Sequence, residues 1–190
     1  MINKNIPALL LIDIQKGLDE LEYYGGHRNN LMAEENAARL LNIWREMEWP
    51  VFHVKHNSTN PNSPLVKGKP GNEIKDMVKP LSKEPVIEKN VNSAFIGTDL
   101  KERLEKQSIS QLVIAGLTTE HCISTTVRMA GNLGYEIFVL SDATAAFDKT
   151  GISGKKYPAE LVHDIELASL HNEFAIVIET AELVKILNSR

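Results

Sequence analysis

Short apolar runs alternate with longer stretches of helical periodicity along most of the chain. The runs are rich in Val, Ile and Leu, which is typical of strands that are buried on both faces of a parallel sheet. Runs separated by helical segments are the pattern of successive βαβ units. The predicted strands occupy residues 8–12, 51–54, 86–88, 112–115, 137–140 and 174–178.

The stretches after the first and third runs predict helices with recognisable ends. Residues 30–48 carry apolar side chains near helical spacing, and Pro50 forces a break before the second strand. Thr98 is the predicted N-cap of the next helix, because Asp99 and Glu102 suit the positive end of a helix dipole.

Three later helices have similar signals. The first covers about residues 122–133 and ends at Gly134, and the second is opened by Pro158 and continues to about residue 170. Thr180 is predicted to cap the last, which reaches residue 188. By contrast, residues 57–71 are rich in Asn, Ser, Pro and Gly, which predicts a long loop, and a short helix is expected around residues 73–78.

Six strands with intervening helices predict an α/β fold, a three-layer αβα sandwich around a six-stranded, parallel, doubly wound sheet. No internal repeat, low-complexity tract or linker divides the chain, so residues 1–190 are expected to form one domain. In such a sheet, ligands bind outside the carboxyl ends of the strands.

Composition narrows the classes of function. The net charge of −4 is dispersed, without a basic block, so nucleic acid is excluded as a partner and a small-molecule substrate is expected. The one cysteine forms no internal disulfide, and the N-terminal segment is too short in apolar residues for a signal peptide or a membrane span. A cytoplasmic protein without membrane association is therefore expected.

Three reactive side chains stand at or just after predicted strand ends. Asp13 ends the first strand, Lys89 ends the third, and Cys122 follows the fourth by a short turn, so the three are expected to meet. A helix start and a nearby ammonium favour a thiolate at Cys122, with Asp13 as acid–base and Lys89 as electrostatic partner. Individually, each has a structural alternative. Cys122 could be a buried hydrophobic residue, Asp13 could cap a turn, and Lys89 could be a solvated surface group.

Other residues are candidates for binding. Backbone N–H groups near Thr118 and Cys122 suit an oxyanion. His56 and Phe95, with Leu117 beside the turn, are the predicted substrate contacts. Structural roles are the alternative for the remaining polar and aromatic candidates. These are Tyr23 and Tyr24 in the core, His121 as an exposed residue, Asp142 as a cap, and His163 and His171 at the surface or an interface.

Three segments resemble the isochorismatase-like cysteine hydrolases, in the order expected for that superfamily. They read "ALLLIDIQKG", "VIEKNVNSAFIGTDLKERL" and "LVIAGLTTEHCISTTVRMAGNLGYEIFVLSDATAAF". The resemblance implies a Rossmann-like six-stranded parallel sheet, a triad of Cys122, Asp13 and Lys89, and assembly as a homodimer or homotetramer. It also implies a cis peptide between Leu117 and Thr118, with the N–H groups of Thr118 and Cys122 as the oxyanion hole.

Two departures from the family limit the substrate. The region "VFHVKHNSTN" lacks the Asp-x-His arrangement of metal-binding nicotinamidases, and His53 and His56 would diverge on a strand. No metal or other cofactor is therefore expected, and nicotinamide is a poor candidate substrate. True isochorismatases of this family lack the cysteine, so Cys122 favours hydrolysis of a carbon–nitrogen bond.

The main hypothesis is thus a cysteine amidohydrolase that cleaves a small amide or ureido substrate through a thioester. A non-catalytic ligand-binding or redox-thiol domain and an isochorismate-type vinyl ether hydrolase are the alternatives. The pocket walls are expected from residues 18–28, 57–71 and 147–156. Within the last loop, the lysines either contact a substrate carboxylate or are solvated: Lys149, Lys155 and Lys156.

Overall fold

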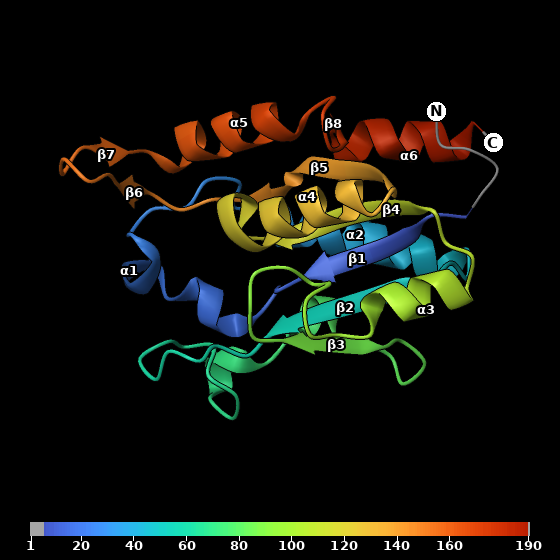
Figure 1. Cartoon of the computed structure of the whole chain (residues 1–190), viewed down its shortest axis with the longest axis horizontal. Helices are drawn as coiled ribbons and strands as arrows, with labels where there is room; N and C mark the ends of the chain where they lie inside the picture. The colour runs from blue at the N-terminus through green and yellow to red at the C-terminus, as the bar shows by residue number, and fades with distance from the viewer. Residues whose placement is uncertain (1–5, 190) are drawn as a thin grey trace.

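The computed structural model describes residues 6–189. The first five residues of the N-terminal segment and residue 190 lie outside the described residues. In Figure 1 the strands of the main sheet cross the middle of the molecule, with helices in front of and behind them. Among the described residues, no helix is both long enough and apolar enough to cross a bilayer.

The main sheet has six strands, each parallel to its neighbours, in the order β3-β2-β1-β4-β5-β8. The chain builds the sheet outward from β1 in one direction and then from β4 in the other. This reversal confirms the doubly wound prediction and opens a crevice at the carboxyl ends of β1 and β4. The strands are β1 (Ala8–Ile12), β2 (Val51–His56), β3 (Val86–Lys89), β4 (Gln111–Leu117), β5 (Glu136–Ala145) and β8 (Ile176–Ile178).

Both faces of the sheet are covered, because side chains alternate along each strand. Leu9 and Leu11 of β1 pack with α2 and α6, whereas Leu10 and Ile12 pack with α3, α4 and α5. The two buried clusters form the core of a three-layer αβα sandwich, as predicted. The helices are α1 (Leu21–Tyr24), α2 (Ala33–Glu46), α3 (Leu100–Lys106), α4 (Ser124–Asn132), α5 (Ala159–Leu170) and α6 (Thr180–Asn188).

Several element ends differ from the predictions. Helix α3 begins at Leu100 with Asp99, and not Thr98, in the N-cap position, but the hydroxyl of Thr98 still accepts a long hydrogen bond from Leu100 N at 3.5 Å. Pro158 occupies the N-cap position of α5 instead of the first helical position. Thr180 is the first residue of α6, and its N–H and hydroxyl both donate to Asp142 Oδ1, at 2.7 and 2.8 Å. The carboxylate of β5 therefore caps α6 from a distance.

Most of the elements that the sequence pattern did not predict are short ones in the connecting segments. The segment expected as a short helix around residues 73–78 contains only a 3-10 turn, η3 (Asp76–Val78). Two further 3-10 turns are η2 (Pro70–Asn72), just before that segment, and η1 (Lys16–Asp19), which follows β1. The antiparallel hairpin of β6 (Lys149–Thr150) and β7 (Lys156–Tyr157) extends from the sandwich on the left of Figure 1.

Candidate active site

Asp13, Lys89 and Cys122 meet at the carboxyl edge of the sheet. The ammonium Nζ of Lys89 donates to Asp13 Oδ2 at 2.6 Å and to Cys122 Sγ at 3.2 Å. The side chain of Lys89 is fully buried and that of Asp13 is 2% exposed, whereas Cys122 is partly exposed. The convergence predicted from strand topology is therefore observed.

The backbone around Asp13 holds its carboxylate at this point. Asp13 has a φ of 53°, in the left-handed region that few residues other than glycine adopt. Its N–H donates to Val54 O at 2.9 Å, and its carbonyl accepts from Gln15 N at 2.8 Å. The chain therefore turns sharply as it leaves β1, with the side chain directed at Lys89.

Cys122 lies in a π-helical turn, η4 (Thr119–Ile123), between β4 and α4. The turn is closed by His121 N and Ile123 N, which donate to Thr118 O at 3.2 and 3.1 Å. The peptide bond between Leu117 and Thr118 is cis, as the family resemblance implied. Among the described residues, the N–H groups of Thr118 and Cys122 take part in none of the backbone hydrogen bonds that close the turn. They are the two donors that the family resemblance implies for an oxyanion.

The thiol of Cys122 is held in its protonated form. Burial raises its pKa, and the negative charge of Asp13 adds to this effect, while Lys89 only partly opposes them. The expectation of a ready thiolate at a helix start is therefore wrong. Burial alone would lower the pKa of Lys89, but Asp13 and Cys122 outweigh it and raise that pKa, so the ammonium stays charged.

His56 is the third hydrogen-bonding partner of the ammonium. Its Nδ1 lies 3.3 Å from Lys89 Nζ. Lysine has only donors, so Nδ1 must be the unprotonated nitrogen. Burial lowers the pKa of His56, and the charge of Lys89 lowers it further, which favours this neutral form.

The same groups would suit a metal ion by spacing alone. Ligand atoms of Asp13, His56 and Cys122 lie within 4.8 Å of one another. The ammonium of Lys89, however, contacts all three groups, at 2.6, 3.3 and 3.2 Å. It already supplies the positive charge at the centre of this set, so a metal would have to displace it.

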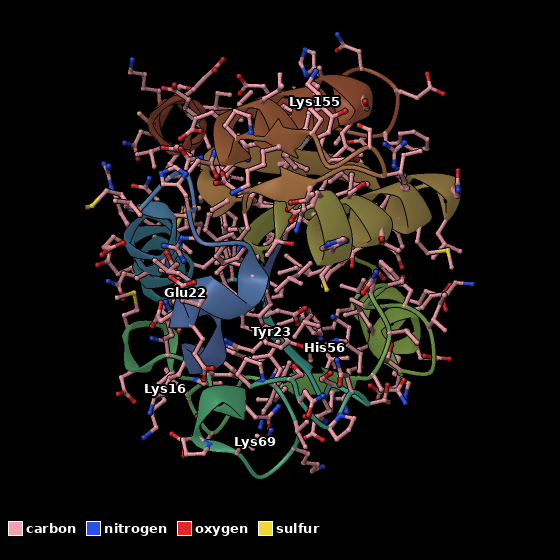
Figure 2. The ribbon with its side chains drawn as sticks, turned by 90° about the vertical axis from the view of Figure 1, so that its left-hand side faces the viewer. Lys16, Glu22, Tyr23, His56, Lys69 and Lys155 are labelled. Carbon is pink, nitrogen blue, oxygen red and sulfur yellow. The ribbon has the colours of Figure 1, made fainter. Side chains whose placement is uncertain are left out.

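A cavity of about 330 Å³ lies above the sulfur atom. His56 and Leu117 line it as predicted, and so do Tyr23 and Tyr24. Figure 2 views the molecule from the side where the strands end, and Tyr23 and His56 lie near each other on this face. A wider depression of about 540 Å³ lies at the opposite end of β5, and none of the candidate residues lines it.

Phe95 is placed differently from the prediction. Its ring stacks on Tyr135, with centroids 5.8 Å apart, and packs against the buried cluster that lies between the sheet and helices α3, α4 and α5. It lies outside the lining of the cavity. The neighbouring Ala94 N donates to Thr126 Oγ1 of α4 at 3.1 Å, which fixes the segment between β3 and α3 against that helix.

Among the other histidines, the prediction for His163 is wrong and that for His121 is confirmed. His163 was expected at the surface, but it is 5% exposed, and its two ring nitrogens lie 2.9 Å from Thr119 Oγ1 and 3.0 Å from Ser141 O. It fixes the first residue of the turn that carries Cys122. His121 lines the cavity, although its side chain is 56% exposed.

Gln15 is a positioning residue that the sequence pattern did not single out. Its buried amide donates to His56 O at 3.0 Å and to Asn72 O at 2.9 Å, and accepts from His56 N at 2.8 Å. It thereby joins the end of β2 to the loop that follows. The signal available in the sequence was an amide residue two positions after Asp13, just beyond the predicted strand end.

The chain is similar in sequence and in structure to proteins of one known family. The Isochorismatase domain family matches residues 7–182. The isochorismatase family protein YrdC of Bacillus subtilis is 46% identical over 177 residues, 93% of this chain and 94% of that protein. Nicotinamidase 3 of Arabidopsis thaliana is 28% identical over 194 residues, 95% of this chain and 88% of that protein. The crystal structure of an isochorismatase-family protein from Chromobacterium violaceum has a TM-score of 0.94 at 39% identity, covering 100% of this chain and 97% of that one.

Proposed function

This chain belongs to the isochorismatase family of hydrolases, and on that premise we propose that it cleaves a carbon–nitrogen bond of a small amide or ureido substrate. The observation that carries the proposal is the ammonium of Lys89, which bridges a carboxylate and a thiol beneath a cavity. A similar protein is named as a nicotinamidase, an enzyme that acts on an amide, which supports this class of reaction.

The first step is attack by sulfur. Because the pKa of the thiol is raised, a base must take its proton as the sulfur–carbon bond forms. Asp13 Oδ1 is buried and has no hydrogen-bond partner among the described residues, so it is free to accept that proton. The carbonyl electron pair moves onto oxygen, where the N–H groups of Thr118 and Cys122 can donate to it.

The second step releases the amine. Asp13 returns the proton to the nitrogen, and the carbon–nitrogen bond breaks. Ammonia or an amine departs, and the acyl group remains on Cys122 as a thioester. Water then attacks the thioester as Asp13 takes one of its protons. The carbon–sulfur bond breaks, the acid product leaves, and the proton on Asp13 restores the thiol. Lys89 keeps a positive charge beside both acidic groups throughout.

The redox-thiol alternative is less well supported. Oxidation by peroxide needs a thiolate, and the raised pKa of Cys122 disfavours it in the free protein. Hydrolysis of a vinyl ether needs no thiol, so it leaves the contact between Lys89 and Cys122 unexplained.

Ammonia release tests the proposal. Nicotinamide, carbamoyl amino acids, maleamate and biuret are incubated with the wild type, with Cys122→Ala and with the control variant Ser169→Ala in the exposed face of α5. One or more compounds should release ammonia, and Cys122→Ala should lose at least about a thousandfold in kcat while the control keeps its rate. Full activity of Cys122→Ala, or pyruvate release from isochorismate that survives alkylation of the thiol, would refute the proposal.

A further inference from the structure

The ionised side chains around the cavity are arranged in pairs. At its floor, Asp13 pairs with Lys89 at 2.6 Å. At its mouth, Lys149 of β6 lines the cavity and pairs with Glu120 of η4 at 2.7 Å. Each positive charge thus faces a negative charge supplied by the protein.

The pair at the mouth involves the cation that a carboxylate-bearing substrate would need. Lys149 is 33% exposed, whereas the side chain of Glu120 is 8% exposed. The two are close but not aligned as a directed hydrogen bond, and neither carboxylate oxygen of Glu120 has a hydrogen-bond partner in the described part of the chain. Glu120 therefore holds Lys149 by charge and depends on it for compensation, since an isolated buried carboxylate is unfavourable.

The histidines of the lining add no net charge near neutral pH. Burial lowers the pKa of His56, and burial also lowers the pKa of His121 at the mouth. The remaining polar lining is uncharged. It includes the hydroxyl and amide side chains of six residues: Tyr23, Tyr24, Ser58, Asn60, Ser63 and Asn92.

One further hydroxyl faces the reacting centre. Thr118 lines the cavity, is 7% exposed, and its Oγ1 has no hydrogen-bond partner among the described residues. A buried hydroxyl without a partner is unfavourable by about 1–3 kcal/mol, so a ligand that hydrogen-bonds to it is favoured. An uncharged amide has both the donors and the acceptor for such a contact.

We propose that this cavity selects substrates that are uncharged, and that Glu120 determines this specificity by neutralising Lys149. That the selected molecules are substrates rests on the proposed function, whereas the pairing of charges is a property of the cavity itself. A substrate with a carboxylate would lose hydration on entry and find every cation already paired.

Two alkylating reagents of matched size test this charge selection without any turnover. Iodoacetamide is neutral and iodoacetate is anionic, and the single cysteine makes the mass increase of the chain report on Cys122 alone. The ratio of the two alkylation rates is divided by the ratio measured for free N-acetylcysteine. For the wild type, this normalised preference for iodoacetamide should be about tenfold or more.

Variants of the ion pair give the test its direction. Glu120→Gln leaves Lys149 unpaired and should lower the normalised preference at least threefold, by raising the rate with iodoacetate. Lys149→Met leaves the carboxylate of Glu120 uncompensated and should keep or increase the preference. The double variant should return to the wild-type value, and thermal melting checks that each variant is folded.

Specific results overturn the inference. They are a wild type that reacts with both reagents in the free-thiol ratio, a Glu120→Gln variant with an unchanged ratio, or a Lys149→Met variant that prefers iodoacetate. If Glu120→Gln fails to fold, the Lys149→Met result decides. A protein that passes this test but releases no ammonia from any amide refutes the proposed function alone, so the two failures are distinguishable.

Discussion

At the scale of single residues, the hydrogen-bond capacity of one ammonium explains the arrangement of the site. The ammonium of Lys89 has three N–H donors, and three neighbouring atoms accept from it: Asp13 Oδ2, Cys122 Sγ and His56 Nδ1. The ammonium is thereby fixed between the proposed base and the proposed nucleophile. His56 then acts as a positioning residue, because it holds Lys89 and not the reacting atoms.

Substitutions of His56 separate positioning from a role as cavity wall. His56→Asn keeps an acceptor near the place of Nδ1, whereas His56→Ala removes it. We expect His56→Ala to lose about tenfold in kcat, equivalent to roughly 1.4 kcal/mol, and His56→Asn to lose less than about threefold. The measurement is steady-state ammonia release with the best substrate found. A change confined to KM in both variants would contradict the positioning role.

The triad was predictable because its residues stand where apolar runs end. Other residues of the site were not, because their roles depend on which way a side chain turns. His163 lies on a helix whose periodicity is weak, and it faces Thr119 only because α5 packs against η4. The pKa of Cys122 was predicted in the wrong direction because burial depends on the packed structure and not on chain position.

At the scale of elements, the close approach of β1 and β4 determines where the turn with Cys122 begins. Gly116 pairs with Ile12, has a φ of 131°, and a Cβ atom there would lie 2.0 Å from Ile12 O. The register of β4 against β5 also shifts between Ile114 and Gly116. Glycine is therefore required at this position for both space and backbone angle.

Replacement of this glycine should strongly destabilise the fold. Gly116→Ala is expected to lower the free energy of unfolding by about 3 kcal/mol or more, because β1 and β4 must separate. Gly134→Ala is a matched control, since its φ of 88° is also positive but no atom lies within 4 Å of the added Cβ. The control should lose only about 1 kcal/mol. Urea unfolding measures both, and equal losses would show that the contact with Ile12 is unimportant.

Strand and helix positions were largely predictable, but their lengths were not. The predicted fifth strand stopped at residue 140, whereas β5 continues through Ser141, Asp142 and Thr144. These polar residues resemble a strand end in the sequence. They stay in the strand because the protein supplies their partners: Asp142 caps α6, and Asn30 donates to the carbonyls of Ser141 and Thr144.

At the scale of the whole molecule, strand order followed from topology, but the long loop did not. Residues 57–71 lack any periodicity, so their path depends on tertiary contacts. Asn72 fixes this path by donating to His56 O and Leu65 O, both at 2.9 Å. The cavity wall thus forms only after the loop has returned to the end of β2.

An ion-pair network joins separate parts of the fold and should make stability depend on pH. Glu84, in the loop before β3, accepts from Arg45 of α2 at 2.8 and 2.7 Å and lies 2.9 Å from His53 of β2. Burial opposes the charged form of Glu84, but the hydrogen bonds from Arg45, Leu81 N and His53 outweigh it and lower the pKa of Glu84 to about 2. The folded state therefore favours the carboxylate.

The sign of the pH dependence follows from this shift. Glu84 should stabilise the fold fully above its ordinary pKa of 4.5, and this contribution should be lost as pH falls toward about 2. Glu84→Gln should be less stable than the wild type by about 1–3 kcal/mol near neutral pH. The difference between the two proteins in urea unfolding should shrink across this acid window. A difference that stays constant down to the lowest pH would exclude the network as its source.

The separation of the triad along the chain has a consequence for synthesis on the ribosome. Asp13 and Lys89 are 76 residues apart, and Cys122 follows Lys89 by 33 more. A nascent chain that has extruded β1, β2 and β3 still lacks Cys122, and β4 must insert beside β1 before the sulfur reaches the carboxylate. On the proposed mechanism, translation intermediates are thus inactive as hydrolases, and activity arises only when the sheet has been completed on both sides of its first strand.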